Sequence, residues 1–144
     1  MGPERGLDIT LRTAGVDDVA AVLALWEAAD AVPSVTDTAE VVERLVTEHE
    51  ALVVAVAGGV VVGTVIAGWD GWRGNLSRLA VHPDMRRRGL GTRLVREAEC
   101  RLKERGAVRI TALVVAEESH AQAFWSALGY DADLRIIRYV STLE

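Results

Sequence analysis

The segment from Leu79 to Leu94 contains residue types whose order suits the binding of a phosphate group. It reads LAVHPDMRRRGLGTRL, so an apolar run is followed by three consecutive arginines and then by Gly89 and Gly91. Glycine lets the backbone approach a ligand closely. The first N–H groups of a helix have no internal partner and lie at the positive end of the helix dipole. A strand, a basic glycine-containing loop and a helix in this order predict an anion site at residues 86–92.

Two common phosphate-binding motifs do not fit this segment. A Walker A loop ends in Gly-Lys-Ser/Thr, whereas this loop reads Gly91-Thr92-Arg93. A dinucleotide fingerprint follows the first strand and needs a third glycine, at the position where this chain has Leu94. The plain alternative to a ligand site is a solvated basic turn in which glycine serves only the geometry.

The elements that must position this loop alternate between strands and helices. β-branched or alternating runs predict the strands, and apolar stripes at helical spacing predict the helices. Gly58-Gly59 between two β-branched runs indicates a hairpin. Strands are expected at residues 9–12, 52–56, 60–66, 75–81, 108–115 and 134–140, and helices at 19–29, 37–49, 89–105 and 119–128.

The order β-α-α-β-β-β-α-β-α-β predicts an α/β (α+β) fold. We expect one mixed, mostly antiparallel, twisted sheet with helices on both faces. Strands joined without helices pair antiparallel, and the unit from Asn75 to Val115 adds a parallel pair by a right-handed crossover. The length of 144 residues corresponds to one domain, 1–144. Asp37 and Ser119 are expected to cap the second and fourth helices.

Composition narrows the class of protein. Sixteen Lys and Arg against 21 Asp and Glu give a net charge of −5, which argues against a dedicated nucleic-acid binder. The single cysteine, Cys100, forms no internal disulfide, predicting a reducing cytoplasm, and we expect it to pack beside the core. The three histidines and this cysteine lack metal-ligand spacing, so no metal is expected. Neither a signal peptide nor a membrane span is predicted.

The sequence resembles the GNAT superfamily of acyl-CoA-dependent N-acetyltransferases. The family's pyrophosphate-loop pattern, Gln/Arg-x-x-Gly-x-Gly/Ala, matches RRRGLG at residues 86–91, which LAVHP introduces. A second family-like segment is AQAFWSALGY at residues 121–130. Trp26, Gly68-x-Asp70-Gly71 and Arg73-Gly74 further resemble the small bacterial YpeA-type acetyltransferases. The resemblance covers essentially the whole chain and implies the GNAT fold.

The resemblance implies that acetyl-CoA is the co-substrate and that a primary amine attacks it directly, without a covalent enzyme intermediate. Loop amides would hold the pyrophosphate, and the pantetheine arm would pair with strand 75–81 where it splays from strand 108–115. A backbone N–H near Val81 would polarise the thioester carbonyl. The expected coenzyme A contacts are Leu79, Ala80, Val81, Arg86, Arg87, Arg88, Gly89, Leu90, Gly91, Thr92, Ser119, Ala123 and Trp125.

The acid–base residues depart from the family pattern. Trp125 stands where many relatives have a tyrosine acid, and approximately Val114 stands where others have a glutamate. Val81, through its N–H, and Asp70 and Glu117, as proton acceptors through water, are the catalytic candidates. A site without a strong base favours an α-amine, whose pKa is about 8, over a lysine, whose pKa is about 10.4.

The acceptor pocket is expected to be formed by tryptophans and acidic residues, namely Trp26, Glu27, Asp30, Trp69 and Trp72. The acceptor would be a small-molecule, peptide or protein-terminal amine, and the protein a monomer or homodimer without nucleic-acid or membrane partners. Two alternatives stay open. A non-catalytic acyl-CoA sensor fits the missing tyrosine and glutamate, and a general anion- or RNA-binding domain fits the basic loop.

Overall fold

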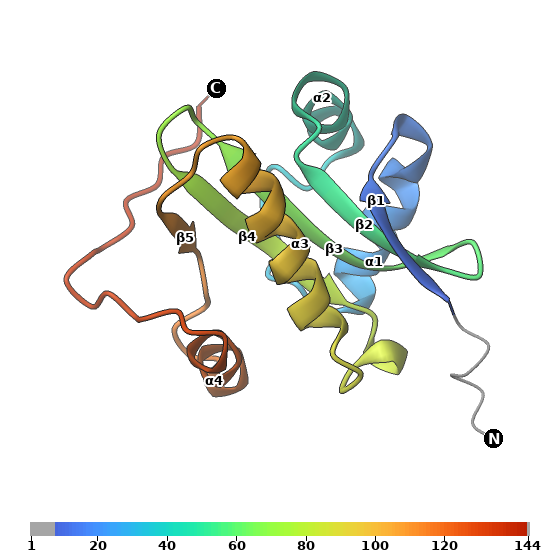
Figure 1. Cartoon of the computed structure of the whole chain (residues 1–144). Helices are drawn as coiled ribbons and strands as arrows, with labels where there is room; N and C mark the ends of the chain where they lie inside the picture. The colour runs from blue at the N-terminus through green and yellow to red at the C-terminus, as the bar shows by residue number, and fades with distance from the viewer. Residues whose placement is uncertain (1–7, 144) are drawn as a thin grey trace. The chain divides into compact units, whose positions relative to one another are not determined.

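The computed structural model describes residues 8–143, which divide into two compact units between Ala112 and Leu113 (Figure 1). The first unit contains a sheet, three helices and two short 3-10 turns. Its elements are β1 (Ile9–Thr13), η2 (Val16–Asp18), α1 (Val19–Ala28), α2 (Ala39–His49), β2 (Leu52–Ala57), β3 (Val60–Trp69), β4 (Gly74–Val81), η3 (Pro83–Met85), α3 (Leu90–Glu104) and β5 (Ile110–Ala112). The second unit contains α4 (Ser119–Ala127).

The sheet has the strand order β1-β2-β3-β4-β5. The first three junctions are antiparallel, and β4 and β5 are parallel. This arrangement confirms the predicted mixed, mostly antiparallel sheet, with α3 as the crossover into the parallel pair. Gly58 and Gly59 have φ values of 56° and 78° and form the β2–β3 hairpin turn, as their sequence predicts.

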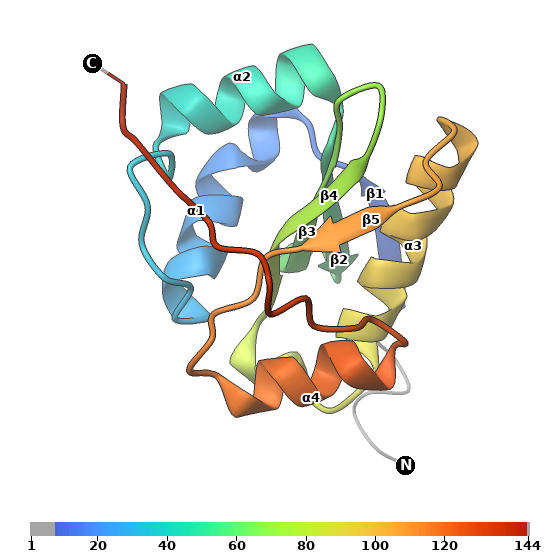
Figure 2. The same cartoon turned by 90° about the vertical axis from the view of Figure 1, so that its left-hand side faces the viewer.

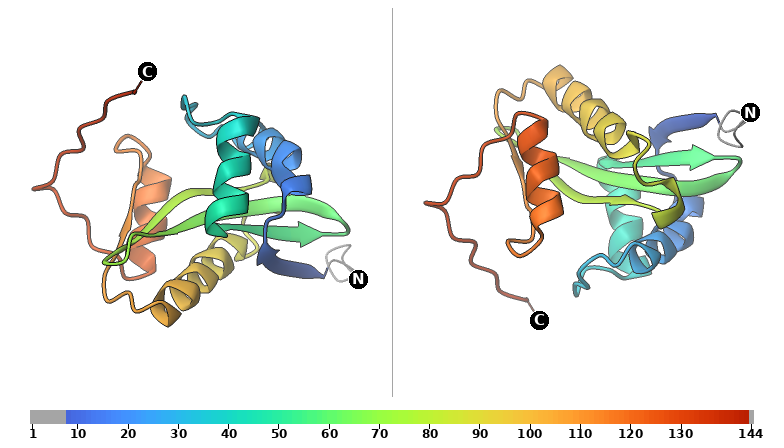
Figure 3. Two further views of the ribbon diagram at one scale, coloured as in Figure 1. Left: turned by 90° about the horizontal axis from the view of Figure 1, so that it is seen from above. Right: turned by 90° about the horizontal axis from the view of Figure 1, so that it is seen from below.

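Helices cover both faces of this sheet. Figures 2 and 3 show α1 and α2 on one side and α3 on the other. Trp26, Val22 and Val46 join a buried cluster with Leu52 and Val54 of β2 on the first face. The apolar stripe of α3 is buried on the opposite face, as its spacing predicts; it comprises Leu90, Leu94, Val95, Ala98 and Leu102.

The C-terminal part of the chain departs from the prediction. Residues 134–140 form no strand, and their apolar side chains are exposed. β5 spans only Ile110–Ala112, not residues 108–115. An apolar, β-branched run becomes a strand only where a neighbouring edge supplies its hydrogen bonds. Within residues 113–143 of the second unit no strand is present, so no strand of that unit can pair with this segment.

Three local predictions also need correction. Thr38, whose side chain accepts from the Val41 N–H, caps α2 in place of Asp37. Glu118 occupies the N-cap position of α4, so Ser119 is the first helical residue instead. Cys100 is exposed, because it lies off the buried stripe of α3.

No helix in residues 8–143 is long and apolar enough to cross a membrane.

Candidate functional site

The loop between β4 and α3 has the backbone shape of an anion site. Met85 is buried and anchors it, and the side chains that follow are exposed. Arg87 and Gly89 both adopt left-handed conformations, with φ values of 65° and 76°. Left-handed residues in a turn make neighbouring N–H groups converge into an anion-binding concavity. The first internal bond of α3 runs from Arg93 N–H to Gly89 O, so the preceding amides at the start of the helix are available to a ligand.

The three arginines of this loop have different surroundings. Arg86 Nη2 donates to the Ala29 carbonyl at 3.3 Å, which ties the loop to the C-terminal end of α1. Within residues 8–143, the side chains of Arg87 and Arg88 show no hydrogen bond or ion pair. Two cationic side chains therefore remain to attract a phosphate, and the third holds the loop in place.

Beyond Leu76, the edge of β4 that faces away from β3 pairs with no strand within residues 8–143. Its pairing with β5 ends at Leu76 and Ala112, and β4 continues to Val81. His82 N–H donates to Val62 O on β3. Successive N–H groups of a strand point to opposite edges. The N–H of Val81 therefore faces the edge away from β3, where an extended ligand can pair.

A β-bulge interrupts β4 at Arg78. Thr64 of β3 is opposite Ala80, whereas Ile66 is opposite Ser77, so a single residue of β3 faces both Arg78 and Leu79. Arg78 has a φ of 50°, in the left-handed region that non-glycine residues rarely adopt. The extra residue places the side chains of Ser77 and Arg78 on the same face of the sheet, the face covered by α1.

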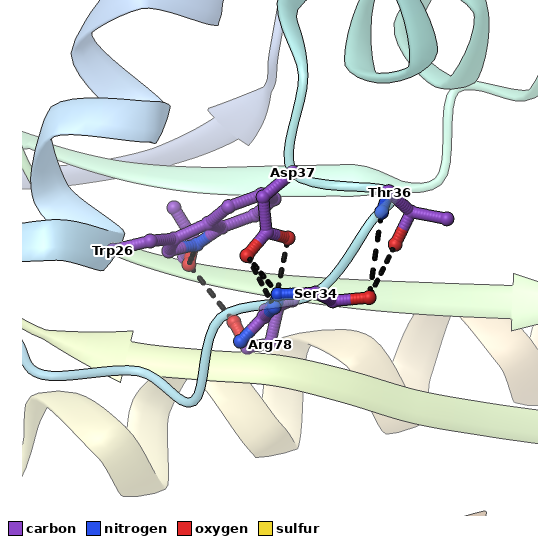
Figure 4. Close-up of polar contacts among 6 residues, drawn as sticks. Trp26, Ser34, Thr36, Asp37 and Arg78 are labelled. Carbon is purple, nitrogen blue, oxygen red and sulfur yellow. Dashed lines mark hydrogen bonds and ion pairs between the residues drawn. The ribbon is translucent and has the colours of Figure 1, made fainter.

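Arg78 and three residues that contact it or each other form what we call the Arg78 cluster: Trp26, Asp37, Thr64 and Arg78. Figure 4 labels Trp26, Asp37 and Arg78 of this cluster. The Trp26 Nε1–H donates to Thr64 Oγ1 at 2.9 Å, and the Thr64 hydroxyl donates to the Arg78 carbonyl at 2.9 Å. Arg78 Nη2 lies 2.7 and 2.6 Å from the two carboxylate oxygens of Asp37. The Arg78 guanidinium also lies 5.1 Å from the centroid of the Trp26 ring, within cation–π distance.

Asp70 lies in a tight turn at the opposite end of β4. Its Oδ1 accepts from the N–H groups of Trp72 and Arg73 at 2.8 and 2.7 Å. These two hydrogen bonds hold the pKa of the Asp70 carboxyl below its ordinary value, and the bond from the Arg73 N–H has the larger effect. A lowered pKa makes a weaker base. The eight residues of β4 span about 23 Å at 3.3 Å per residue, so the turn is far from the loop.

The structure does not gather the predicted acceptor residues into one pocket. Trp26 is buried in the core, whereas Glu27 and Asp30 are exposed at the C-terminal end of α1. Trp69 lines a cavity of about 640 Å³, which Cys100 also lines. Trp72 is exposed, with the guanidinium of Arg73 4.1 Å from its ring centroid. Trp69 and Trp72 lie at the turn between β3 and β4.

The remaining predicted residues belong to the second unit. Ser119, Ala123 and Trp125 lie on α4, and Glu117 just before it. Trp125 is buried and makes edge contacts with the rings of Phe124 and Tyr130, at centroid distances of 5.4 and 4.9 Å. The predicted roles of these residues in coenzyme A binding and catalysis stay predictions.

Sequence reasoning missed the roles of Arg78, Asp37 and Thr64. One signal was present: Arg78 is the charged residue in a mostly apolar strand segment, LSRLAV. A buried or half-buried charge needs a partner, and the pattern alone does not show which residue supplies it. The partner is 41 residues away in the chain.

Comparison with known proteins identifies the family. The model of the acetyltransferase (GNAT) family matches residues 20–130. A curated acetyltransferase of Photorhabdus laumondii is 36% identical over 109 residues, covering 75% of this chain and 76% of the relative. One of Pectobacterium atrosepticum is 34% identical over 116 residues, covering 80% and 82%.

Solved structures show the same fold. The PaiA N-acetyltransferase of Thermoplasma acidophilum in complex with coenzyme A has a TM-score of 0.77 at 16% identity, covering 88% of this chain and 91% of the other. The aminoglycoside N-acetyltransferase AAC(6')-Iy in complex with CoA has a TM-score of 0.76 at 22% identity, covering 99% and 100%. With the family model matching most of the sequence, this chain belongs to the GNAT family of acetyltransferases.

Proposed function

We propose that this chain transfers the acetyl group of acetyl-CoA to a primary amine by direct attack. One observation carries the proposal: the edge of β4 beyond its pairing with β5 leads directly into the basic loop at residues 86–92, in which Arg87 and Gly89 are left-handed and which opens α3. A pyrophosphate in the loop would place the pantetheine arm along Leu79 and Val81, as in the family that the chain belongs to. The exposed Arg87 and Arg88 fit the charge of such a ligand.

In this reaction the nitrogen of a neutral amine attacks the thioester carbonyl carbon. The carbonyl oxygen gains negative charge, which the N–H of Val81 stabilises. The carbonyl then re-forms as the C–S bond breaks, the attacking nitrogen loses one proton to water, and coenzyme A leaves as a thiolate. Because the pKa of a thiol is about 8.5, no protein acid has to protonate the leaving group near neutral pH. Cys100 forms no acyl intermediate in this scheme.

The acceptor follows from the weakness of the available bases. The lowered pKa of Asp70 reduces its ability to accept a proton, and the role of Glu117 depends on the second unit. At pH 7 about 10% of an α-amine is neutral but below 0.1% of a lysine side chain. We therefore expect an α-amine of a small molecule, peptide or protein terminus as the acceptor, in the cytoplasm of a bacterial cell.

The first test is the thermal midpoint with and without acetyl-CoA. A ligand at 100 times its dissociation constant adds about 2.7 kcal/mol to the free energy of unfolding, or about 5–10 °C for a chain of this size. Coenzyme A should give a similar rise, and ATP or pyrophosphate alone should not. Replacing Arg87 and Arg88 with glutamine should reduce the rise, whereas Arg105→Gln at the far end of α3 should not.

A panel of amines followed by thiol release then separates the alternatives. Release of coenzyme A with α-amines supports the transferase. A thermal shift without turnover of any amine would support the non-catalytic acyl-CoA sensor instead. No shift at saturating acetyl-CoA would mean that the loop is a solvated basic turn, and the proposal would fail.

A further inference from the structure

We propose that Arg78 is a positioning residue for acetyl transfer: through the Arg78 cluster it holds the β4 bulge in the shape that turns the N–H groups of Leu79 and Val81 toward the thioester. This inference rests on the proposed function. It concerns a different feature from the loop, because Arg78 lies on the α1 face of the sheet and its side chain binds Asp37.

The bulge controls which backbone groups the open edge presents. With the bulge in place, Thr64 is opposite Ala80, and the N–H groups of Leu79 and Val81 face away from β3. If β4 continued regularly from Ser77 opposite Ile66, Thr64 would be opposite Leu79 instead. A one-residue shift of register reverses the direction of every N–H and side chain beyond it. The N–H groups of Leu79 and Val81 would then point into the sheet.

The conformation of Arg78 needs external support. A non-glycine residue with a φ of 50° is strained, and such strain persists where the surroundings over-determine it. Two independent contacts do so here. The fully buried Thr64 hydroxyl holds the Arg78 carbonyl, which the bulge displaces from its regular ladder position, and Asp37 holds the guanidinium.

Both ends of the Arg78–Asp37 pair are themselves fixed. Asp37 belongs to a turn in which its Oδ2 accepts from the Ser34 N–H at 3.0 Å and its own N–H donates to the Ser34 carbonyl at 3.0 Å. The side chains of Arg78 and Asp37 are only 18% and 21% exposed, so solvent screens the pair less than a surface pair. The ion pair therefore restrains the backbone conformation of the bulge.

The test measures the thioester carbonyl directly. Infrared difference spectra of bound [1-13C]acetyl-CoA should show the carbonyl stretch at lower frequency than in free acetyl-CoA, because a fixed N–H polarises it. In Arg78→Gln this displacement should shrink, and the dissociation constant of acetyl-CoA should stay within about twofold. With an amine that releases thiol, kcat should fall about tenfold to a hundredfold, as misplaced catalytic groups do, and Arg78→Lys should restore part of it.

A matched control comes from another short ion pair in the same unit. Arg12 lies on β1, at the edge of the sheet opposite β5, and its Nη1 is 2.7 Å from Asp18 Oδ2. Arg12→Gln removes a comparable pair and should leave both the carbonyl stretch and kcat unchanged. Thr64→Val tests the cluster from its other side: it keeps the shape of the side chain and removes both bonds of the hydroxyl, the one to the Arg78 carbonyl and the one from Trp26 Nε1–H. It should weaken the carbonyl displacement as Arg78→Gln does.

The outcomes separate this inference from the proposed function. A parental carbonyl stretch and kcat in folded Arg78→Gln would overturn the positioning role and leave the transferase intact. If Arg78→Gln does not fold, an unchanged stretch in Thr64→Val would overturn it. Failure of the parental protein to bind acetyl-CoA would overturn the proposed function, and this inference with it.

Discussion

Replacing Gly63 with alanine should push α3 away from the sheet. A Cβ at this position would lie 2.9 Å from Leu94 Cδ1 and 3.4 Å from the Ala80 carbonyl oxygen, and Leu94 is fully buried. Overpacking of this kind costs about 1–3 kcal/mol, and removing a strand glycine offsets about 0.5–1 kcal/mol. The free energy of unfolding should therefore fall, by up to about 2.5 kcal/mol, which lowers the thermal midpoint by up to about 10 °C.

If the proposed site is right, the same change should weaken coenzyme A binding, because Leu94 lies one turn into α3, whose first amides are proposed to face the pyrophosphate. We expect the dissociation constant to rise about threefold to tenfold, equivalent to about 0.7–1.4 kcal/mol. Gly74→Ala provides the comparison at the other end of α3. Its Cβ would lie 2.7 Å from Leu102 Cδ1, so it should destabilise the fold similarly and leave coenzyme A affinity unchanged.

Thermal unfolding and isothermal titration with coenzyme A measure the two effects. Gly68→Ala is the control, because its Cβ would meet only the Asn75 oxygen at 3.6 Å and the Asn75 Cβ at 3.9 Å, which are ordinary contacts. A parental thermal midpoint for Gly63→Ala would show that Leu94 rotates aside and that the helix does not move. Equal losses of affinity in Gly63→Ala and Gly74→Ala would refute the link between local displacement of the loop and binding.

Two further predictions concern carboxylates with lowered pKa values. The hydrogen bond from Arg12, followed by that from the Gly15 N–H, lowers the pKa of Asp18 below its ordinary 3.8. This stabilisation is present above that ordinary pKa and is lost as the pH falls through the lowered one. Asp18→Asn should therefore reduce stability at pH 7 and shrink the difference between pH 7 and pH 2 in denaturant unfolding. Asp70→Asn should keep kcat within about twofold, because two backbone N–H groups already occupy its Oδ1; a loss of an order of magnitude or more would restore Asp70 as a proton acceptor.

Much of the fold was predictable because it depends on local patterns. The stripe of Leu90, Leu94, Ala98 and Leu102 indicated α3, and all four are buried. Gly58-Gly59 indicated the hairpin between two β-branched runs. The unpaired segment at residues 134–140 was not predictable, because its apolar composition favours a strand regardless of whether a neighbouring edge is present.

The candidate site also has a part that local sequence predicts and a part that depends on tertiary structure. The basic loop followed by a helix is contiguous in the chain, so RRRGLG indicated a candidate anion site, and together with AQAFWSALGY at residues 121–130 it indicated the family. The bulge at Arg78 depends on the register between two strands, and its support comes from Trp26, Asp37 and Thr64 on three other segments. Asp37 resembled a helix cap by spacing, but a carboxylate binds the strongest donor within reach, and only tertiary packing brought the Arg78 guanidinium to it.

The sequence by itself therefore indicated the order of elements from β1 to α4, a candidate anion loop and the family, because each depends on patterns within short stretches. Tertiary structure decided which amides of β4 face the open edge and which carboxylates are already engaged. The physical reason is that strand register and ion pairing depend on residues far apart in the chain, and their geometry exists only once the sheet and helices have packed.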